Sequence, residues 1–232
     1  MRSRGLLWAL ALLLQAASAQ PRPDVAEILQ KVSAAYKGAS QYELTLDETR
    51  TPQGNHQPES AHARVVFKAP NQYRMESTVS GSADDDPTLD ETVLIHNGST
   101  LWIYLPRSNQ YLSYPADKAA DDPELSAHTP EAADPLFMEK YRDAADYAAG
   151  AKLIREEGIE FAGVKVSCYV VSVPEKAQRP FTWWVDKLSY RILREVSASE
   201  TTVYTTVKLG EPLPENVFQF EPPPGARQID VN

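Results

Sequence analysis

The feature that most constrains the fold is a succession of short segments whose hydrophobic period is two residues. The first segment, "SQYELTLDETR" (residues 40–50), alternates Tyr42, Leu44 and Leu46 with polar residues, as a half-buried β-strand does. Similar patterns predict ten further strands, at residues 61–68, 72–79, 91–96, 100–105, 110–114, 151–161, 164–173, 181–186, 190–196 and 201–208. Asn97-Gly98 is typical of a hairpin turn between two of them. So many consecutive strands predict an antiparallel sandwich or barrel.

Two segments have the helical period instead. Asp24 and Glu27 form a candidate capping box ahead of an apolar stripe that ends near Gly38. A second helix is expected in "PLFMEKYRDAADYAA", with Phe137 and Tyr141 on one face. Because each stripe must cover an apolar surface, we expect a strongly curved sheet with both helices across its mouth.

Several strands are apolar on both faces, including "TLWIYL", "CYVVSV" and "FTWWV". One face of such a strand can meet a helix or a cavity, and the other face must also meet something apolar. The stretch "LIHNGSTLWIYLPRSNQYLSYP" (residues 94–115) is therefore expected to be a wall of a hydrophobic interior.

The first nineteen residues have the pattern of a secretory signal peptide. Arg2 and Arg4 precede an apolar run, and residues 17–19 (Ala-Ser-Ala) form a cleavage site. The run is too short to be a transmembrane helix. The only cysteine is Cys168, so no thiol follows the cleavage site for acylation. We expect export, cleavage after Ala19, and a soluble periplasmic domain comprising residues 20–232.

Composition and motifs argue against several functional classes. The chain has 32 acidic and 23 basic residues, which argues against nucleic-acid binding. It contains no nucleophile elbow, phosphate-binding loop, zinc-protease motif or C-x-x-C pair. Its four histidines match no ligand spacing: His56, His62, His96 and His128. We expect no cofactor, metal site or enzymatic activity, and a hydrolase with an unrecognised site is the alternative from the enzyme class.

Three motifs, in order, carry a family resemblance. "VVFKAPNQYRMES", then "LIHNGSTLWIYLPRSNQY", and finally "VFQFEPPPGARQID" resemble the periplasmic lipoprotein carrier LolA and its relatives. The resemblance spans residues 24–230 and implies a mainly β protein with some α-helix. The implied fold is an unclosed antiparallel half-barrel of about eleven strands, with a helical lid over a hydrophobic cavity that takes lipoprotein acyl chains.

The resemblance also implies site residues and partners. We expect the cavity lining to include Leu44, Leu46, Phe67, Tyr73, Met75, Trp102 and Tyr104. We expect the lid helices to contribute Ile28, Val32, Phe137 and Tyr141. The expected partners of this monomer are a lipoprotein or other acylated cargo, an inner-membrane releasing complex and an outer-membrane receptor. Ala69 departs from the family's arginine before the proline, which puts the usual relay in doubt. The alternative function for the same fold is that of an envelope sensor of the RseB type.

Overall fold

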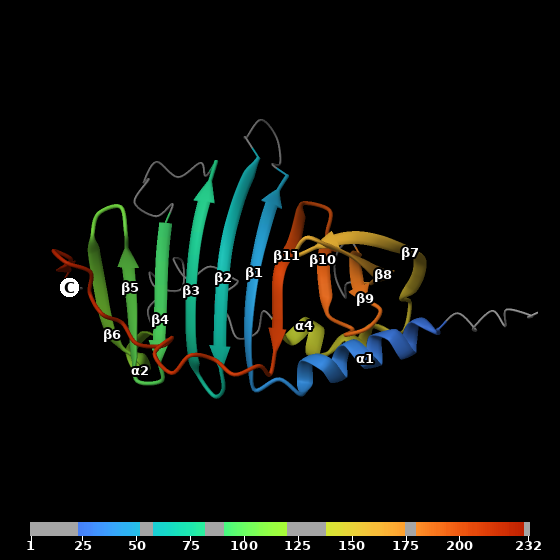
Figure 1. The fold of residues 1–232 in the computed structure, drawn as a ribbon, viewed down its shortest axis with the longest axis horizontal. Helices are drawn as coiled ribbons and strands as arrows, with labels where there is room; N and C mark the ends of the chain where they lie inside the picture. Colours follow the sequence, from blue (N-terminus) through green and yellow to red (C-terminus); the bar gives the residue numbers. More distant parts are fainter. Residues whose placement is uncertain (1–22, 52–57, 82–90, 120–137, 175–179, 230–232) are drawn as a thin grey trace, which may run out of the picture.

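The protein is built around one twelve-stranded sheet in a computed structural model that describes residues 23–51, 58–81, 91–119, 138–174 and 180–229 (Figure 1). The strands are β1 (Gln41–Arg50), β2 (Glu59–Lys68), β3 (Gln72–Ser80), β4 (Glu91–Asn97), β5 (Thr100–Leu105), β6 (Gln110–Pro115), β7 (Lys152–Phe161), β8 (Val164–Val173), β9 (Phe181–Asp186), β10 (Ile192–Val196), β11 (Glu200–Leu209) and β12 (Arg227–Gln228). Their order in the sheet is β12-β6-β5-β4-β3-β2-β1-β11-β10-β9-β8-β7. The sheet is not closed on itself.

The predicted strands are all present. Every neighbouring pair is antiparallel except β12 and β6, which pair in parallel over two residues. Strand β12 was not predicted, because a two-residue strand carries no periodic signal. The predicted start of β10 at residue 190 is too early, because Tyr190 has a positive φ of 56° and belongs to a turn in which Asp186 accepts from the amides of Leu188 and Ser189.

The opening helix, α1 (Val25–Lys37), begins as predicted. The Asp24 side chain accepts from the Ala26 amide at 3.3 Å. Glu27 forms an ion pair of 2.7 Å with Lys31. The short helix α2 (Ala116–Ala119) follows β6.

The second predicted helix is broken in two. It is described from Met138 onward as α4 (Glu139–Arg142) and the 3₁₀ helix η4 (Ala144–Tyr147). Ser33 of α1 donates its hydroxyl to the Arg142 carbonyl, which is the acceptor that a continuing α-helix would use. A contact between helices therefore overrides the local helical pattern.

The two faces of the sheet carry different layers. The inner face is defined here as the one that carries α1, α4 and η4. Tyr36 of α1 accepts from the Ile192 amide at 2.9 Å, while the rings of Tyr141 and Tyr147 contact Trp183 of β9. A continuous buried apolar core extends from these helices to the inner face of β6. The unclosed antiparallel half-barrel with helices on its apolar inner face, predicted from the sequence, is confirmed.

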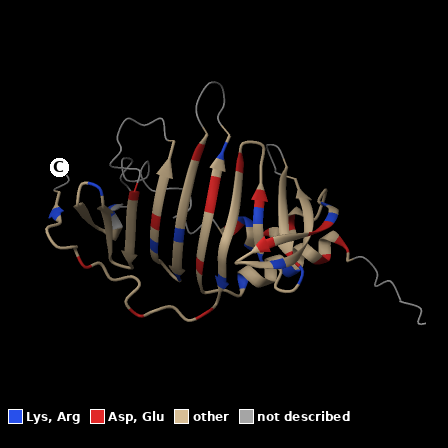
Figure 2. Cartoon of the chain, turned by 45° about the horizontal axis from the view of Figure 1, so that its top comes forward, with Lys and Arg blue, Asp and Glu red and all other residues tan. Residues whose placement is uncertain are grey.

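The outer face is partly covered by the C-terminal segment, which is defined here as residues 210–229. In Figure 1 this segment runs in red across the ends of the central strands towards β6. Val217 and Phe218 pack on Val66 of β2 and form a second, smaller apolar cluster. Elsewhere the central strands carry charges of both signs (Figure 2), such as Glu43, which accepts from Arg64 at 3.0 Å.

Candidate functional site

Six apolar residues on the inner face, one on each of β1 to β6, form a continuous row. Each is directly opposed to the next in the register of β1 to β6, and we call them the aliphatic row: Leu44, Val65, Met75, Leu94, Ile103 and Leu112. The first four are at most 2% exposed, Ile103 is 6% exposed, and Leu112 is half-buried. The row contains no polar side chain.

A second row lies on one side of the aliphatic row, two residues away along each strand. We call it the aromatic row, because five of its six residues have rings. It comprises Tyr42, Phe67, Tyr73, His96, Leu101 and Tyr114, again as directly opposed neighbours. Tyr42 stacks on Phe67 and Tyr73 stacks on His96, both with ring centroids 5.1 Å apart. Burial raises the pKa of the Tyr73 phenol. These stacked pairs line one side of the aliphatic row.

On the opposite side of the aliphatic row lies a shorter row on β1 to β4, in which one leucine is followed by three small or polar side chains. Its directly opposed members are Leu46, Ala63, Ser77 and Thr92, and we call them the small row. Along β2, β3 and β4 the inner side chains therefore change from a ring through an aliphatic residue to a small or polar one, whereas β1 keeps Leu44 and Leu46 and β5 keeps Leu101 and Ile103.

The helices are held at one end of this surface by a buried carboxylate. Glu195 of β10 is 4% exposed and accepts from Lys140 Nζ at 2.6 Å, Tyr141 OH at 2.9 Å and Trp183 Nε1 at 2.8 Å. Tyr141 also lies 2.9 Å, OH to OH, from Tyr204 of β11. Desolvation raises the pKa of Tyr141 and of Tyr204 well above the usual value, and the negative charge of Glu195 adds to the effect. We call these five residues the Glu195 cluster, and it fixes α4 to β9, β10 and β11.

Five of the seven expected cavity residues lie on the inner face. Leu44 and Met75 belong to the aliphatic row, Phe67 and Tyr73 to the aromatic row, and Leu46 to the small row. Of the expected lid residues, Ile28, Val32 and Tyr141 are buried in the same core, and Phe137 lies outside the described residues.

Trp102 and Tyr104 lie on the outer face instead. They alternate along β5 with Leu101 and Ile103, which point into the core, and their rings are 6.0 and 6.1 Å from the ring of Phe220 in the C-terminal segment. The apolar partner that the second face of β5 requires is thus supplied by the chain itself.

Four further inner-face residues were not predicted individually as cavity lining, although three of them lie in the stretch 94–115 that was expected to be a wall of the hydrophobic interior. Val65, Leu94, Ile103 and Leu112 follow the same alternation as Met75, so the strand period could have identified them. Glu195 gave no comparable signal, because an acid in a strand is ordinarily at the surface.

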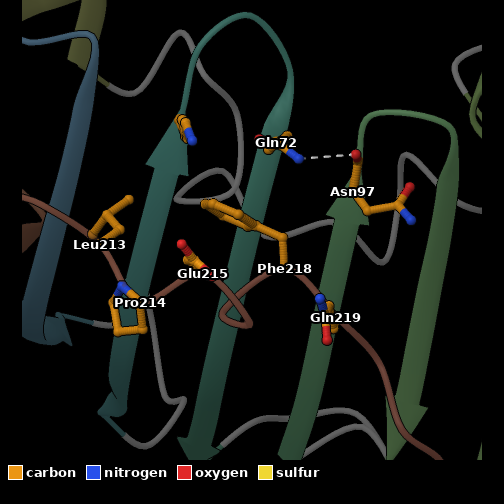
Figure 3. A pocket seen from close by; sticks show the side chains of 8 residues that line it. Gln72, Asn97, Leu213, Pro214, Glu215, Phe218 and Gln219 are labelled. Atoms are coloured by element: carbon orange, nitrogen blue, oxygen red, sulfur yellow. Dashed lines mark hydrogen bonds between the residues drawn. The ribbon is translucent and has the colours of Figure 1, made fainter.

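The C-terminal segment forms a pocket of about 330 Å³ with the ends of β2, β3 and β4 (Figure 3). Lys68, Gln72 and Asn97 line one side. The C-terminal segment lines the other with Leu213, Pro214, Glu215, Phe218 and Gln219. Gln72 Nε2 donates to the Asn97 carbonyl at 3.1 Å. The lining mixes charged, amide and apolar side chains, so the pocket is much less suited to an acyl chain than the inner face is. Within the described parts of the chain no group of three or more metal-ligating side chains is present.

An unclosed antiparallel half-barrel with a largely apolar inner face, and with helices fixed to the β9–β11 end of that face, defines the structural class. The chain belongs to the family described as "Predicted periplasmic protein (DUF2092)", which matches residues 25–232. None of the described helices is long and apolar enough to cross a membrane. The expected signal peptide at residues 1–19 lies outside the described residues.

Individual relatives are distant. "Uncharacterized protein MJ0687" of Methanocaldococcus jannaschii is 23% identical over 208 residues, which cover 87% of this chain and 52% of that protein. The chain thus spans about half the length of this curated relative. LprF of Mycobacterium bovis is 16% identical, with 84% of this chain and 96% of that chain covered and a TM-score of 0.50, which indicates a shared fold. A chain of the Pseudomonas aeruginosa MucA/MucB complex is 15% identical, with 86% of this chain and 62% of that chain covered and a TM-score of 0.46.

Proposed function

We propose that this protein is a LolA-like periplasmic carrier that binds the acyl chains of lipoproteins or of other lipids on its inner face and hands them to an outer-membrane acceptor. The observation that carries the proposal is the aliphatic row, in which six strands of an open sheet contribute one uninterrupted and largely buried line of apolar side chains. The description of the family as periplasmic supports the location.

The energetics favour such a carrier. Removing an acyl chain from water gains about 0.8 kcal/mol per methylene, so a lipidated protein needs a shield in order to cross an aqueous compartment. Neighbouring strands lie about 4.8 Å apart, so the five intervals of the row span about 24 Å, the scale of a long fatty acyl chain.

Binding on this surface requires movement. Met75 and Leu94 are fully buried, so an acyl chain reaches them only when the side chains that cover them are displaced. The sequence contains no phosphate-binding loop, so release follows from a difference in affinity between closed and open states.

A fluorescent fatty acid titrated into the exported, purified protein tests acyl-chain binding. We expect saturable binding that Met75→Glu abolishes, because a carboxylate in an apolar site is costly without a partner. The matched control is Thr78→Glu, an exposed position on the outer face of the same strand. Should Met75→Glu unfold, the half-buried Tyr73→Glu replaces it, and equal binding by the folded variant and the wild type would contradict the proposal.

The carrier role is separable from that of an envelope sensor. Transfer of an acylated lipoprotein from inner-membrane vesicles to outer-membrane vesicles, with the protein as the only soluble component, is expected for a carrier. Crosslinking in the envelope that recovers mainly a transcriptional regulator, with no transfer, would favour the sensor.

A further inference from the structure

The side chains of the inner face vary more along the central strands than across them. Along β3, the inner side chains change from Tyr73 through Met75 to Ser77 within five residues. Across the strands, the chemistry stays aliphatic from β1 to β6. Because an acyl chain is chemically uniform along its length, it matches the aliphatic row, which crosses six strands, better than a path along β2, β3 or β4.

The two ends of the aliphatic row differ. Leu44 lies beside Val207 of β11 and is 1% exposed, and on the neighbouring strand β10 the Ile192 amide donates to Tyr36 of α1. At the other end, Leu112 is half-buried on β6, whose edge pairs with β12 at Gln110 and Tyr111. Burial is thus complete at the β1 end, which we call the sealed end, and decreases towards β6.

On the basis of the proposed function, we infer that a bound acyl chain lies across the strands along the aliphatic row, with its terminal methyl towards β1 and α4 and its polar end at β6. The sealed end suits the methyl group, which gains from full burial. The β6 end suits the headgroup or the protein part of the cargo, which must stay in water. The aromatic and small rows flank the chain along its length. The site thus accepts linear acyl chains and limits their length to the span of the row.

Photoreactive fatty acids test this orientation in the wild-type protein. One probe carries a diazirine at its methyl end and the other carries it next to the carboxylate, and the labelled residues are identified by mass spectrometry. The methyl-end probe is expected to label the segments around Leu44 and Val65, and the carboxylate-end probe those around Ile103 and Leu112. A reversed order, or labels that follow a single strand from Tyr73 to Ser77, would overturn the inferred orientation alone. Labels confined to the outer face, or no labelling, would overturn the proposed function as well.

Two substitutions give an independent readout. Leu112→Trp is expected to weaken the binding of short and long fatty acids alike, because it narrows the β6 end of the row, which both must pass. Val65→Phe is expected to raise the Kd of octadecanoic acid at least about tenfold more than that of decanoic acid. The larger side chain takes up the space of a few methylenes near the sealed end, which only the longer acid reaches. The control is Ser113→Trp, which lies on the outer face of β6 next to Leu112. Equal length dependence for Leu112→Trp and Val65→Phe, in folded variants, would contradict the inferred orientation.

Discussion

Tyr141 of α4 donates its hydroxyl to the buried carboxylate of Glu195 on β10 over 2.9 Å. The same carboxylate accepts from Lys140 and Trp183, so one side chain connects the helical layer to the sheet. Removing one partner of such a buried, hydrogen-bonded charge is costly, although the intact group stabilises the fold only modestly relative to an apolar core. The Glu195 cluster therefore defines where the helices sit.

Replacement of this carboxylate should be strongly destabilising. Glu195→Ala removes the carboxylate that accepts from Tyr141 and Trp183 and pairs with Lys140, and we expect it to lower the free energy of unfolding by about 3 kcal/mol. The control is Glu156→Ala, which removes an exposed partner of Lys187 and should cost less than about 1 kcal/mol. Urea unfolding measures both, and equal effects would show that the cluster does not stabilise the fold.

Stability should fall at alkaline pH. Burial raises the pKa of Tyr36, Tyr141 and Tyr204 above the ordinary value of about 10, so these phenols ionise more readily in the unfolded chain. Their contribution is fully present below pH about 10 and is lost as the pH rises above it. The midpoint of urea unfolding should therefore decrease between pH 9 and 11. Tyr204→Phe should make this decrease shallower, and an unchanged slope would contradict the role of its phenol.

The single thiol should be unreactive in the folded protein. Cys168 is buried on β8, and burial raises its pKa to about 12. We expect iodoacetamide at pH 8 to modify it only when the chain is unfolded in urea, as followed by intact mass. Modification of the native protein at the rate of a free thiol would show that this face of β8 is accessible.

The C-terminal segment should be held by Phe220. Its ring lies 5.3 Å from that of Tyr111, in addition to its contacts with Trp102 and Tyr104. Phe220→Ala should cost about 1–2 kcal/mol, because the ring is half-buried, and should speed proteolysis within residues 210–229. Fatty-acid binding should be retained, since the inner face is not touched. Loss of binding would place the ligand on the outer face.

The fold could be predicted from the sequence because its main signal is local. Alternation in segments such as "ELTLDE" identifies strands and their buried faces without tertiary information. The positions of Trp102 and Tyr104 could not be predicted in this way, because a strand that is apolar on both faces does not reveal which face meets the core. The break between α4 and η4 also depends on a distant residue, Ser33, and so does not appear in the local pattern.

The candidate site was predictable only in part for the same reason. Leu44 and Met75 belong to clear alternating patterns, whereas the complete aliphatic row depends on the register between strands. Glu195 becomes a buried acceptor only because Lys140, Tyr141 and Trp183 converge on it in the folded chain.

The most direct test of the central proposal is organic extraction of the protein, purified from the envelope of cells that export it, followed by mass spectrometry of the extract. Native mass spectrometry of the same sample measures the occupancy. Acyl-chain binding on the inner face predicts an acylated lipid or lipoprotein in substantial occupancy, which the folded Met75→Glu variant lacks and the Thr78→Glu variant retains. Protein that is repeatedly free of acylated material, and that binds no added fatty acid, would contradict it.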